Sequence, residues 1–198
     1  MTEPAFELYA FWRSSATFRV RVALNLKGLK AREILIDLDA GEQLSADFLA
    51  VNPEGKTPAL LIDGRLLTEV AGILYYLARA YPAARLMPAN DPEAEAHVVS
   101  WMSFIASTVH PARRQGLEHA MGVYRLADER LGDREWAVGD YSIADIHLFR
   151  LFWRFAGSLN PPPGAFPNLQ AHHDRMLARP AVIRTIETEA AIGYELPG

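Results

Sequence analysis

The chain has 198 residues, of which 50% are apolar and 22% charged, and its formal net charge is −4. This length allows one large domain or two small ones with a sizeable core, and the charge balance argues against a general nucleic-acid or polybasic membrane partner. Because cysteine is absent, disulfides, thiolate metal sites and a protein thiol nucleophile are excluded. The start of the sequence has no hydrophobic signal core, and no apolar stretch is long enough to span a bilayer, so we expect a cytoplasmic protein.

The first half of the N-terminal region mixes strand and helix patterns. Residues 6–11 are aromatic-rich and strand-like, and residues 31–38 predict a second strand. Between them, apolar residues recur at helical spacing from Phe18 to Leu29, and Gly28 fits a helix C-cap. Strand, helix and strand within about 35 residues indicate a right-handed βαβ unit with a parallel strand pair.

The next segment predicts a hairpin between two helices. Residues 42–51 have helical spacing, and residues 58–62 form a short, continuously apolar strand. Asp63-Gly64 is a typical hairpin turn into residues 65–67, and a helix over residues 68–81 follows. The sum is βαβ followed by ββα, a mixed four-stranded α/β sheet with helices on both faces.

Three prolines within residues 81–92, namely Pro82, Pro88 and Pro92, indicate a linker between domains. We therefore divide the chain into an α/β domain at residues 1–81, a linker at 82–91 and an all-α domain at 92–198. Helical spacing in the last of these predicts helices over residues 91–119, 121–131, 142–157, 167–178 and 180–190.

Three polar features stand at element boundaries, and each has a structural explanation beside a functional one. Ser14-Ser15 is either a plain N-cap or an anion site at a helix start. Thr57-Pro58 is either the start of an edge strand or a cis peptide whose threonine faces outward to pair with an extended peptide. Glu69 at the next helix start either favours the dipole or binds a ligand. Spaced through one βαβ–ββα unit, the three converge.

Other familiar sites are missing from the sequence. It contains no dinucleotide-binding glycine motif, no P-loop, no zinc-protease motif and no serine-hydrolase elbow. Nothing places the six histidines with carboxylates at metal-ligand spacing. We expect no metal.

The stretch S-S-A-T-F-R-V-R-V-A-L at residues 14–24 resembles the S-S-C-x-W-R-V-R-I-A-L motif of the zeta class of soluble glutathione S-transferases, the maleylacetoacetate isomerase-like proteins of bacterial type. The N-P-x-x-x-x-P pattern at residues 52–58 and the helix start Y-S-I-A-D-I at residues 141–146 also match the wider family. The second of these is a capping-box variant that we assign to folding. The resemblance covers essentially the whole chain and implies a thioredoxin-like N-terminal domain followed by a helical domain.

The resemblance also implies where the sulfur comes from. Glutathione, as co-substrate, brings its own thiol, whose pKa of about 8.5 must fall by about two units, or ~2.7 kcal/mol, for thiolate to predominate at neutral pH. By family position, Ser14 is the hydroxyl donor, assisted by Ser15. The implied glutathione contacts are Gln43, Lys56, Thr57, Pro58, Glu69, Val70 and His110. The implied wall for the second substrate comprises Phe11, Trp12, Arg13, Arg113 and Arg114.

Two positions depart from the family pattern. Ala16 stands where the zeta motif has cysteine, and Val70 stands where relatives usually have a serine that binds the γ-glutamyl carboxylate. We expect Val70 to offer only its backbone N–H, and Lys56 to compensate in part.

Arg19 and Arg21 are expected in interdomain or surface ion pairs, and Trp101 and Phe104 in core packing.

Three functions follow as alternatives. The first is a glutathione transferase that attacks a small electrophile with the activated thiolate, as detoxifying enzymes do. The second is a glutathione-dependent cis–trans isomerase of the maleylacetoacetate type, in which the same thiolate adds reversibly to a double bond. The third is a non-catalytic member that binds other proteins. The family further implies a homodimer.

Overall fold

The computed structural model describes residues 4–191, and its first part is a four-stranded mixed sheet in the order β2-β1-β3-β4. β1 runs parallel to β2 and antiparallel to β3, so that Phe6 stands opposite both Ala31 and Ile62. This is the predicted βαβ–ββα arrangement. The strands are β1 (Phe6–Ala10), β2 (Ala31–Leu35), β3 (Ala59–Ile62) and β4 (Arg65–Leu67).

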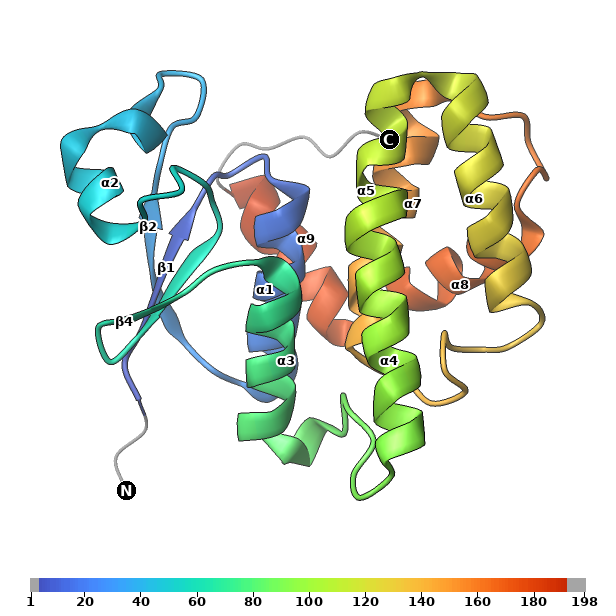
Figure 1. Cartoon of the computed structure of the whole chain (residues 1–198), viewed down its shortest axis with the longest axis horizontal. Coiled ribbons are helices and arrows are strands. Elements are labelled where there is room, and N and C mark those ends of the chain that lie inside the picture. Colours follow the sequence, from blue (N-terminus) through green and yellow to red (C-terminus); the bar gives the residue numbers. More distant parts are fainter. Residues whose placement is uncertain (1–3, 192–198) are drawn as a thin grey trace.

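Helices cover both faces of this sheet. The helices α1 and α3 lie between the sheet and the helical part of the molecule, and α2 lies beyond the sheet on the other side (Figure 1). Alternate residues of β1 are buried, whereas Tyr9 points to the opposite face and packs its ring 5.7 Å from that of Phe48 in α2. The bounds of these helices are α1 (Ser15–Lys27), α2 (Ala46–Val51) and α3 (Val70–Ala80).

Two predicted turns are present with the backbone geometry that their residues favour. Gly28 ends α1 in the left-handed conformation at φ 65°, which a residue without Cβ adopts readily. Asp63 and Gly64 both have positive φ, at 50° and 76°, as a two-residue type I′ hairpin requires.

Two predicted elements are shorter or more broken than the apolar pattern suggests. β2 ends at Leu35 rather than at residue 38, because the chain then turns on the Asp37 carboxylate, which accepts the N–H groups of Asp39 and Ala40. The helix expected over 42–51 divides into η1 (Glu42–Leu44) and α2. Ser45 between them is extended, and its hydroxyl caps α2 by accepting from the Phe48 N–H.

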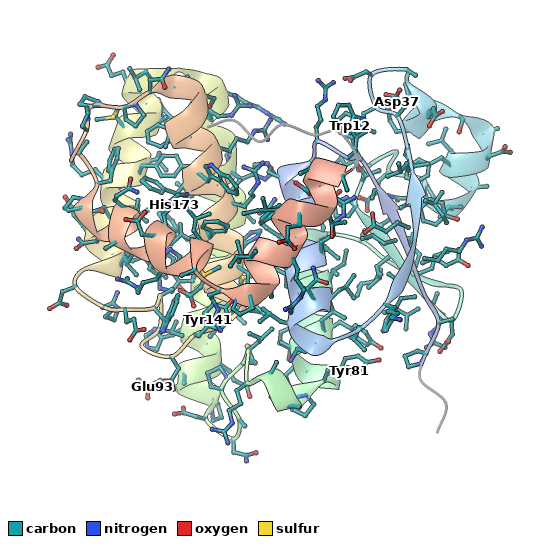
Figure 2. All side chains as sticks on the ribbon, turned by 180° about the vertical axis from the view of Figure 1, so that it is seen from behind. Trp12, Asp37, Tyr81, Glu93, Tyr141 and His173 are labelled. Atoms are coloured by element: carbon teal, nitrogen blue, oxygen red, sulfur yellow. The ribbon has the colours of Figure 1, made fainter. Side chains whose placement is uncertain are left out.

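The second part of the described chain is helical, and α7 lies at its centre. α1 packs against α7 and α9, so one helix of the sheet domain joins the two parts (Figure 1); α9 is seen against α1 from behind (Figure 2). The elements that follow α3 are η2 (Pro82–Ala84), α4 (Pro92–Phe104), η3 (Ile105–Val109), α5 (His110–Ala112), η4 (Arg113–Gln115), α6 (Leu117–Leu131), α7 (Ile143–Leu159), α8 (Pro167–Leu177) and α9 (Pro180–Ala191).

The boundary between the first two long helices of this part differs from prediction. The chain coils continuously from α4 through η3, α5 and η4, then breaks at Gly116, whose φ is 89°. α6 therefore begins at Leu117 and not near Met121. A glycine with positive φ stops the helix where the apolar spacing alone continues.

The capping box predicted at the start of α7 is present. The Ser142 hydroxyl accepts from the Ala144 N–H, and the Asp145 carboxylate accepts from the Ser142 N–H at 2.8 Å. Asp145 is fully buried and also accepts from the Ala137 N–H at 2.8 Å. Its role is structural, as the sequence predicts.

No helix within residues 4–191 has the length and apolar character needed to cross a bilayer.

Arg21 links α9 to the sheet domain through ion pairs. Its guanidinium bonds Glu189 of α9 at 2.6 Å and Glu33 of β2 at 2.7 Å. Arg21 and Glu189 are both almost fully buried. Arg21 is thus an interdomain ion-pair residue, as expected. Burial raises the pKa of Glu189 to about 7, although the charges of Arg21 and Arg150 act in the opposite sense.

Candidate functional site

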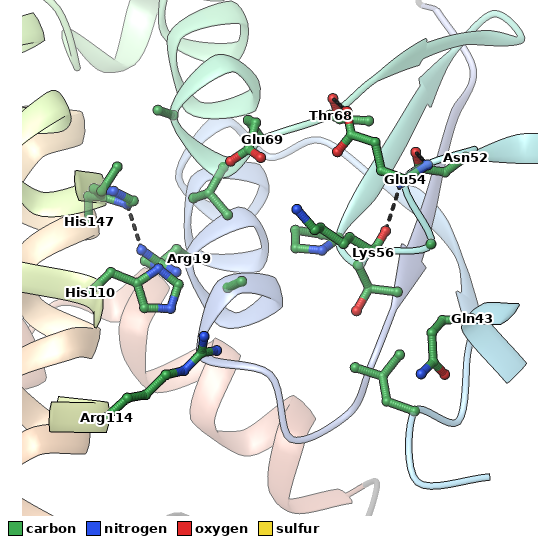
Figure 3. A pocket seen from close by; sticks show the side chains of 18 residues that line it. Arg19, Gln43, Asn52, Glu54, Lys56, Thr68, Glu69, His110, Arg114 and His147 are labelled. Atoms are coloured by element: carbon green, nitrogen blue, oxygen red, sulfur yellow. Dashed lines mark hydrogen bonds between the residues drawn. The ribbon is translucent and has the colours of Figure 1, made fainter. Parts of the chain in front are cut away.

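A cavity of about 460 Å³ opens between the sheet domain and the helical domain. It is bounded by the first turns of α1 and α3, the loop before β3, and side chains from η3, α5, η4 and α7 (Figure 3). The site residues predicted from the sequence that line it are Gln43, Lys56, Thr57, Pro58, Glu69, Val70, His110 and Arg114.

The loop before β3 is held in shape by Asn52, whose side chain is buried. Its amide donates to the Lys56 carbonyl at 2.8 Å and its side-chain oxygen accepts from the Glu54 N–H at 3.1 Å. These two hydrogen bonds hold the loop in a shape in which Lys56 and Thr57 line the cavity. The Thr57–Pro58 peptide bond is cis, which is the second of the two alternatives that the sequence leaves open.

Two buried side-chain oxygens on this wall have no hydrogen-bond partner within the described chain. They are Thr57 Oγ1 and Gln43 Oε1. Since buried polar atoms in native proteins are normally paired, the orphaned oxygens are consistent with a wall that a polar ligand completes.

The start of α3 has unusual backbone geometry. Glu69, which immediately precedes the helix, has φ 62° and ψ 124°, a combination that is costly for a residue with a Cβ. Backbone outliers of this kind persist where the surroundings determine them, and they cluster at ligand sites. The exposed Glu69 side chain and the first residue of the helix, Val70, both line the cavity.

The start of α1 carries the two predicted serines. Ser14 Oγ accepts from the backbone N–H groups of Ala16 and Thr17 at 3.2 and 3.3 Å, so Ser14 is the N-cap. Ser15 is buried, and its Oγ accepts from Arg154 at 3.2 Å. Of this turn, Ala16 lines the cavity, whereas the preceding residues Ser14 and Ser15 are not among its lining residues.

The predicted wall of aromatic and basic residues is only partly assembled. Phe11, Trp12 and Arg13 are not among the residues that line the cavity. The Arg13 guanidinium instead pairs with Asp39 and lies 5.4 and 4.8 Å from the ring centres of Phe11 and Trp12.

Arg113 is also not among the residues that line the main cavity; it lines a small neighbouring cavity with His110, Arg114 and Tyr124. Trp101 is buried in the core, with the ring of Phe104 centred 5.9 Å away, as expected.

Arg19 lines the cavity, which the sequence-based expectation of an ion pair missed. It is 1% exposed and has no carboxylate partner within residues 4–191. Its Nε donates to the Ser15 carbonyl at 2.9 Å and its Nη1 lies 2.7 Å from His147 Nδ1. Burial, followed by the charges of Arg150 and Arg154, lowers the pKa of Arg19 to about 9. The cavity therefore contains a buried cation that makes no ion pair with a carboxylate of residues 4–191.

His147 was also missed by sequence reasoning. It is a polar residue in an otherwise apolar turn of α7, one turn after the capping box, and that pattern is the only signal for it. Burial, Arg19 and His110 hold its pKa well below the usual value. His110 is neutral for the same reasons, since burial and the surrounding arginines lower its pKa to about 4.

Within residues 4–191, no group of three or more histidine, aspartate or glutamate side chains is arranged to hold a metal ion.

Comparisons with known proteins agree with this arrangement. The profile of the glutathione S-transferase N-terminal domain matches residues 4–79, and that of the C-terminal domain matches residues 89–180. A maleylacetoacetate isomerase from Pseudomonas aeruginosa is 32% identical over 201 residues, covering 88% of this chain and 92% of that protein. A zeta-class glutathione S-transferase from Euphorbia esula is 34% identical over 129 residues, covering 65% of this chain and 57% of that protein.

A solved structure extends the similarity to a ligand complex. A glutathione transferase homologue from Sulfitobacter with bound glutathione is 28% identical, with a TM-score of 0.80, and the match covers 93% of this chain and 98% of that one. The two domain profiles together span most of the sequence, and they agree with the sheet domain and the helical domain described above. The chain therefore belongs to the glutathione S-transferase family of enzymes.

Proposed function

We propose that the protein binds glutathione in the interdomain cavity and activates its thiol as a thiolate that attacks a small electrophile. The observation that carries this proposal is the convergence of two helix starts, α1 and α3, with the loop 52–58 on one cavity. Helix starts present free N–H groups and a positive potential, which suit the carboxylates and the thiolate of a small peptide.

The α3 side of the cavity suits the γ-glutamyl end of glutathione. The Glu69 carboxylate pairs with its α-ammonium group, and the N–H of Val70 at the start of α3 binds its carboxylate. Thr57 pairs through its backbone with the cysteinyl unit, while Gln43, Lys56 and His110 supply further polar contacts.

The start of α1 suits the thiol. Ser14 Oγ already accepts two backbone N–H groups, so its own hydrogen is available to donate to a thiolate. Ser15 Oγ accepts from Arg154, so its hydrogen is likewise available to donate. A hydroxyl donor together with a helix N-terminus lowers a thiol pKa. Ser14 is therefore the main donor and Ser15 the assisting one.

A second candidate function is glutathione-dependent cis–trans isomerisation. The relative from Pseudomonas aeruginosa is named for that activity, and reversible addition of the same thiolate to a conjugated double bond supplies it. Ala16, where the zeta motif has cysteine, leaves no protein thiol beside the reacting atoms. A homodimer in the cytoplasm is the proposed setting, on the strength of the family resemblance.

Calorimetric titration with millimolar glutathione, followed by assay with benzyl chloride, tests the proposal. We expect saturable binding and a conjugate in which the glutathione sulfur replaces chloride. A protein that shows no heat and no thermal stabilisation with glutathione is not a glutathione transferase, and the protein-binding alternative then takes its place.

A further inference from the structure

The deepest part of the interdomain cavity holds a contact between two buried side chains from different domains. Arg19 of α1 and His147 of α7 are 1% and 2% exposed, and Nη1 of the arginine lies 2.7 Å from Nδ1 of the histidine. Figure 3 shows this contact on the wall opposite Lys56 and Gln43. Both residues line the cavity.

This contact fixes the hydrogen position on the histidine ring. A guanidinium has only donors, so Nδ1 of His147 must accept. The ring is neutral, because burial and the charge of Arg19 disfavour a second proton, and the hydrogen of a neutral ring that accepts at Nδ1 is on Nε2. Nε2 is buried and has no hydrogen-bond partner within residues 4–191. A side chain of the cavity lining thus carries an N–H donor for which residues 4–191 provide no acceptor.

The charges around this donor favour an electron-rich oxygen. Arg19 is the nearest cation, and Arg114 and the neutral His110 also line the cavity from the helical side. Arg150 and Arg154 add positive charge around Arg19, and Glu69 acts in the opposite sense from the α3 side. A neutral donor beside a buried cation stabilises an oxygen that acquires negative charge, and does so more strongly out of water.

We propose that His147, with Arg19 behind it, binds the carbonyl oxygen of a second substrate in which that carbonyl is conjugated to an electrophilic carbon–carbon double bond. The proposal rests on the function proposed above. Arg19 follows Ala16 by three residues on α1, which places it about 4.5 Å further along the helix axis, on the same side. That separation suits a short conjugated carbonyl lying between the thiolate and the His147 donor.

The electron flow is complete without any further group. The glutathione sulfur forms a bond to the β-carbon, the double-bond electrons move between the α-carbon and the carbonyl carbon, and the oxygen gains a negative charge that the His147 N–H stabilises. Protonation of the α-carbon by water gives the conjugate. Departure of the thiolate before protonation restores the double bond after rotation. His147 is then a catalytic residue common to conjugation and isomerisation.

The test compares two electrophiles in three variants. 4-Phenyl-3-buten-2-one carries the conjugated carbonyl, and benzyl chloride has no oxygen. We expect His147→Leu to lower the ratio of kcat/KM for the ketone to kcat/KM for the chloride about 10- to 100-fold. His147→Gln, which accepts from Arg19 and still donates, should recover most of that ratio. His119→Leu, at an exposed position on α6, should leave it at the wild-type value.

Three results would overturn the inference. The first is an unchanged ratio in His147→Leu, and the second is an equal loss for both electrophiles, which marks a structural residue. The third is a wild-type enzyme that binds glutathione and converts benzyl chloride but not the ketone. Each leaves the proposed transferase function standing, whereas absence of glutathione binding removes that function first. Should His147→Leu not fold, the ratio in His147→Gln against His147→Asn, whose shorter amide does not reach the Nε2 position, decides in its place.

Discussion

Arg19 and His147 are 128 residues apart in the chain and 2.7 Å apart in space, joined across the boundary between the sheet domain and the helical domain. Arg19 stands one helical turn behind the capped start of α1, and its Nε donates back to the Ser15 carbonyl at 2.9 Å. The same side chain therefore connects the helix start that is proposed to activate a thiol with the α7 helix of the other domain. Domain packing and site geometry are coupled through it.

Replacing Ser14 by alanine tests its two roles together. Loss of the N-cap should lower the free energy of unfolding by about 1 kcal/mol, and loss of the hydroxyl donor should raise the pKa of the bound glutathione thiol, read from thiolate absorbance against pH. Ser15→Ala should give a smaller rise in that pKa.

Asp91→Ala is the matched control for the Ser14 variant. Asp91 caps α4 by accepting from the Ala94 N–H at 3.0 Å, on an exposed surface. Its removal should lower stability by a similar amount and leave the thiol pKa at the wild-type value. If Ser14→Ala behaves in the same way as this control, Ser14 is only a cap.

Restoring a hydroxyl at position 70 should tighten glutathione binding. Val70 is 8% exposed and begins α3 beside the cavity. Threonine has the shape of valine and adds one hydrogen-bonding group, so we expect Val70→Thr and Val70→Ser to lower the glutathione Kd about tenfold by calorimetry. Val70→Ala, which adds no polar group, is the control. Equal affinity in all four proteins would mean that the backbone N–H alone binds the carboxylate.

We expect Glu69 to lower the stability of the fold and to strengthen glutathione binding. Glu69→Gly relieves the positive φ of 62° and should raise the free energy of unfolding by about 1 kcal/mol, while weakening glutathione binding. Glu69→Gln keeps the shape and removes the charge, and should raise the Kd about tenfold.

A glutathione analogue that lacks the α-amino group separates these effects. The wild-type protein should bind it more weakly than glutathione, and Glu69→Gln should bind both with similar affinity. A glutamine variant that still prefers glutathione would show that the Glu69 carboxylate does not pair with the ammonium group.

The buried Glu189 predicts a pH dependence of stability. Because its pKa is raised to about 7 in the folded protein, the native state holds a proton that the unfolded chain releases near the ordinary glutamate value. Stability from this group is thus complete in acid and falls as pH rises towards 7, by up to about 1.4 kcal/mol per pH unit. The groups that face it are Arg21 of α1, Glu33 of β2 and Arg150 of α7.

Glu189→Gln removes this titration and keeps the side-chain shape. The difference in Tm between the variant and the wild type should shift in favour of the variant as pH rises from about 5 to 7. A difference that stays constant over that interval would show that Glu189 is charged throughout and fully paired with Arg21.

Local chemistry explains most of what the sequence predicts correctly. Gly28, the Asp63-Gly64 turn and the Ser142–Asp145 capping box each act within a few residues, so their patterns are visible without the fold. The α2 region and the start of α6 are predicted less well, because an extended serine (Ser45) and a glycine with positive φ (Gly116) interrupt otherwise continuous apolar spacing.

The site residues also fall into two groups, those that local sequence motifs indicate and those that only the packing of the domains brings together. Thr57, Pro58 and Glu69 belong to motifs that are contiguous in sequence, and they line the cavity. Arg19 and His147 meet only because α1 packs against α7. Arg13, in contrast, precedes the start of α1 but pairs with Asp39 and does not line the cavity. No local sequence pattern indicates Asp39 as its partner.

The central claim is that this cavity binds glutathione and holds its sulfur as a thiolate, although the chain has no cysteine of its own. The most direct measurement is the ultraviolet thiolate absorbance of the wild-type protein saturated with glutathione, followed against pH. We predict a titration with an apparent pKa about two units below the ~8.5 of the free thiol. A bound thiol that titrates at the free value, or no thiolate signal at saturating glutathione, would contradict the account.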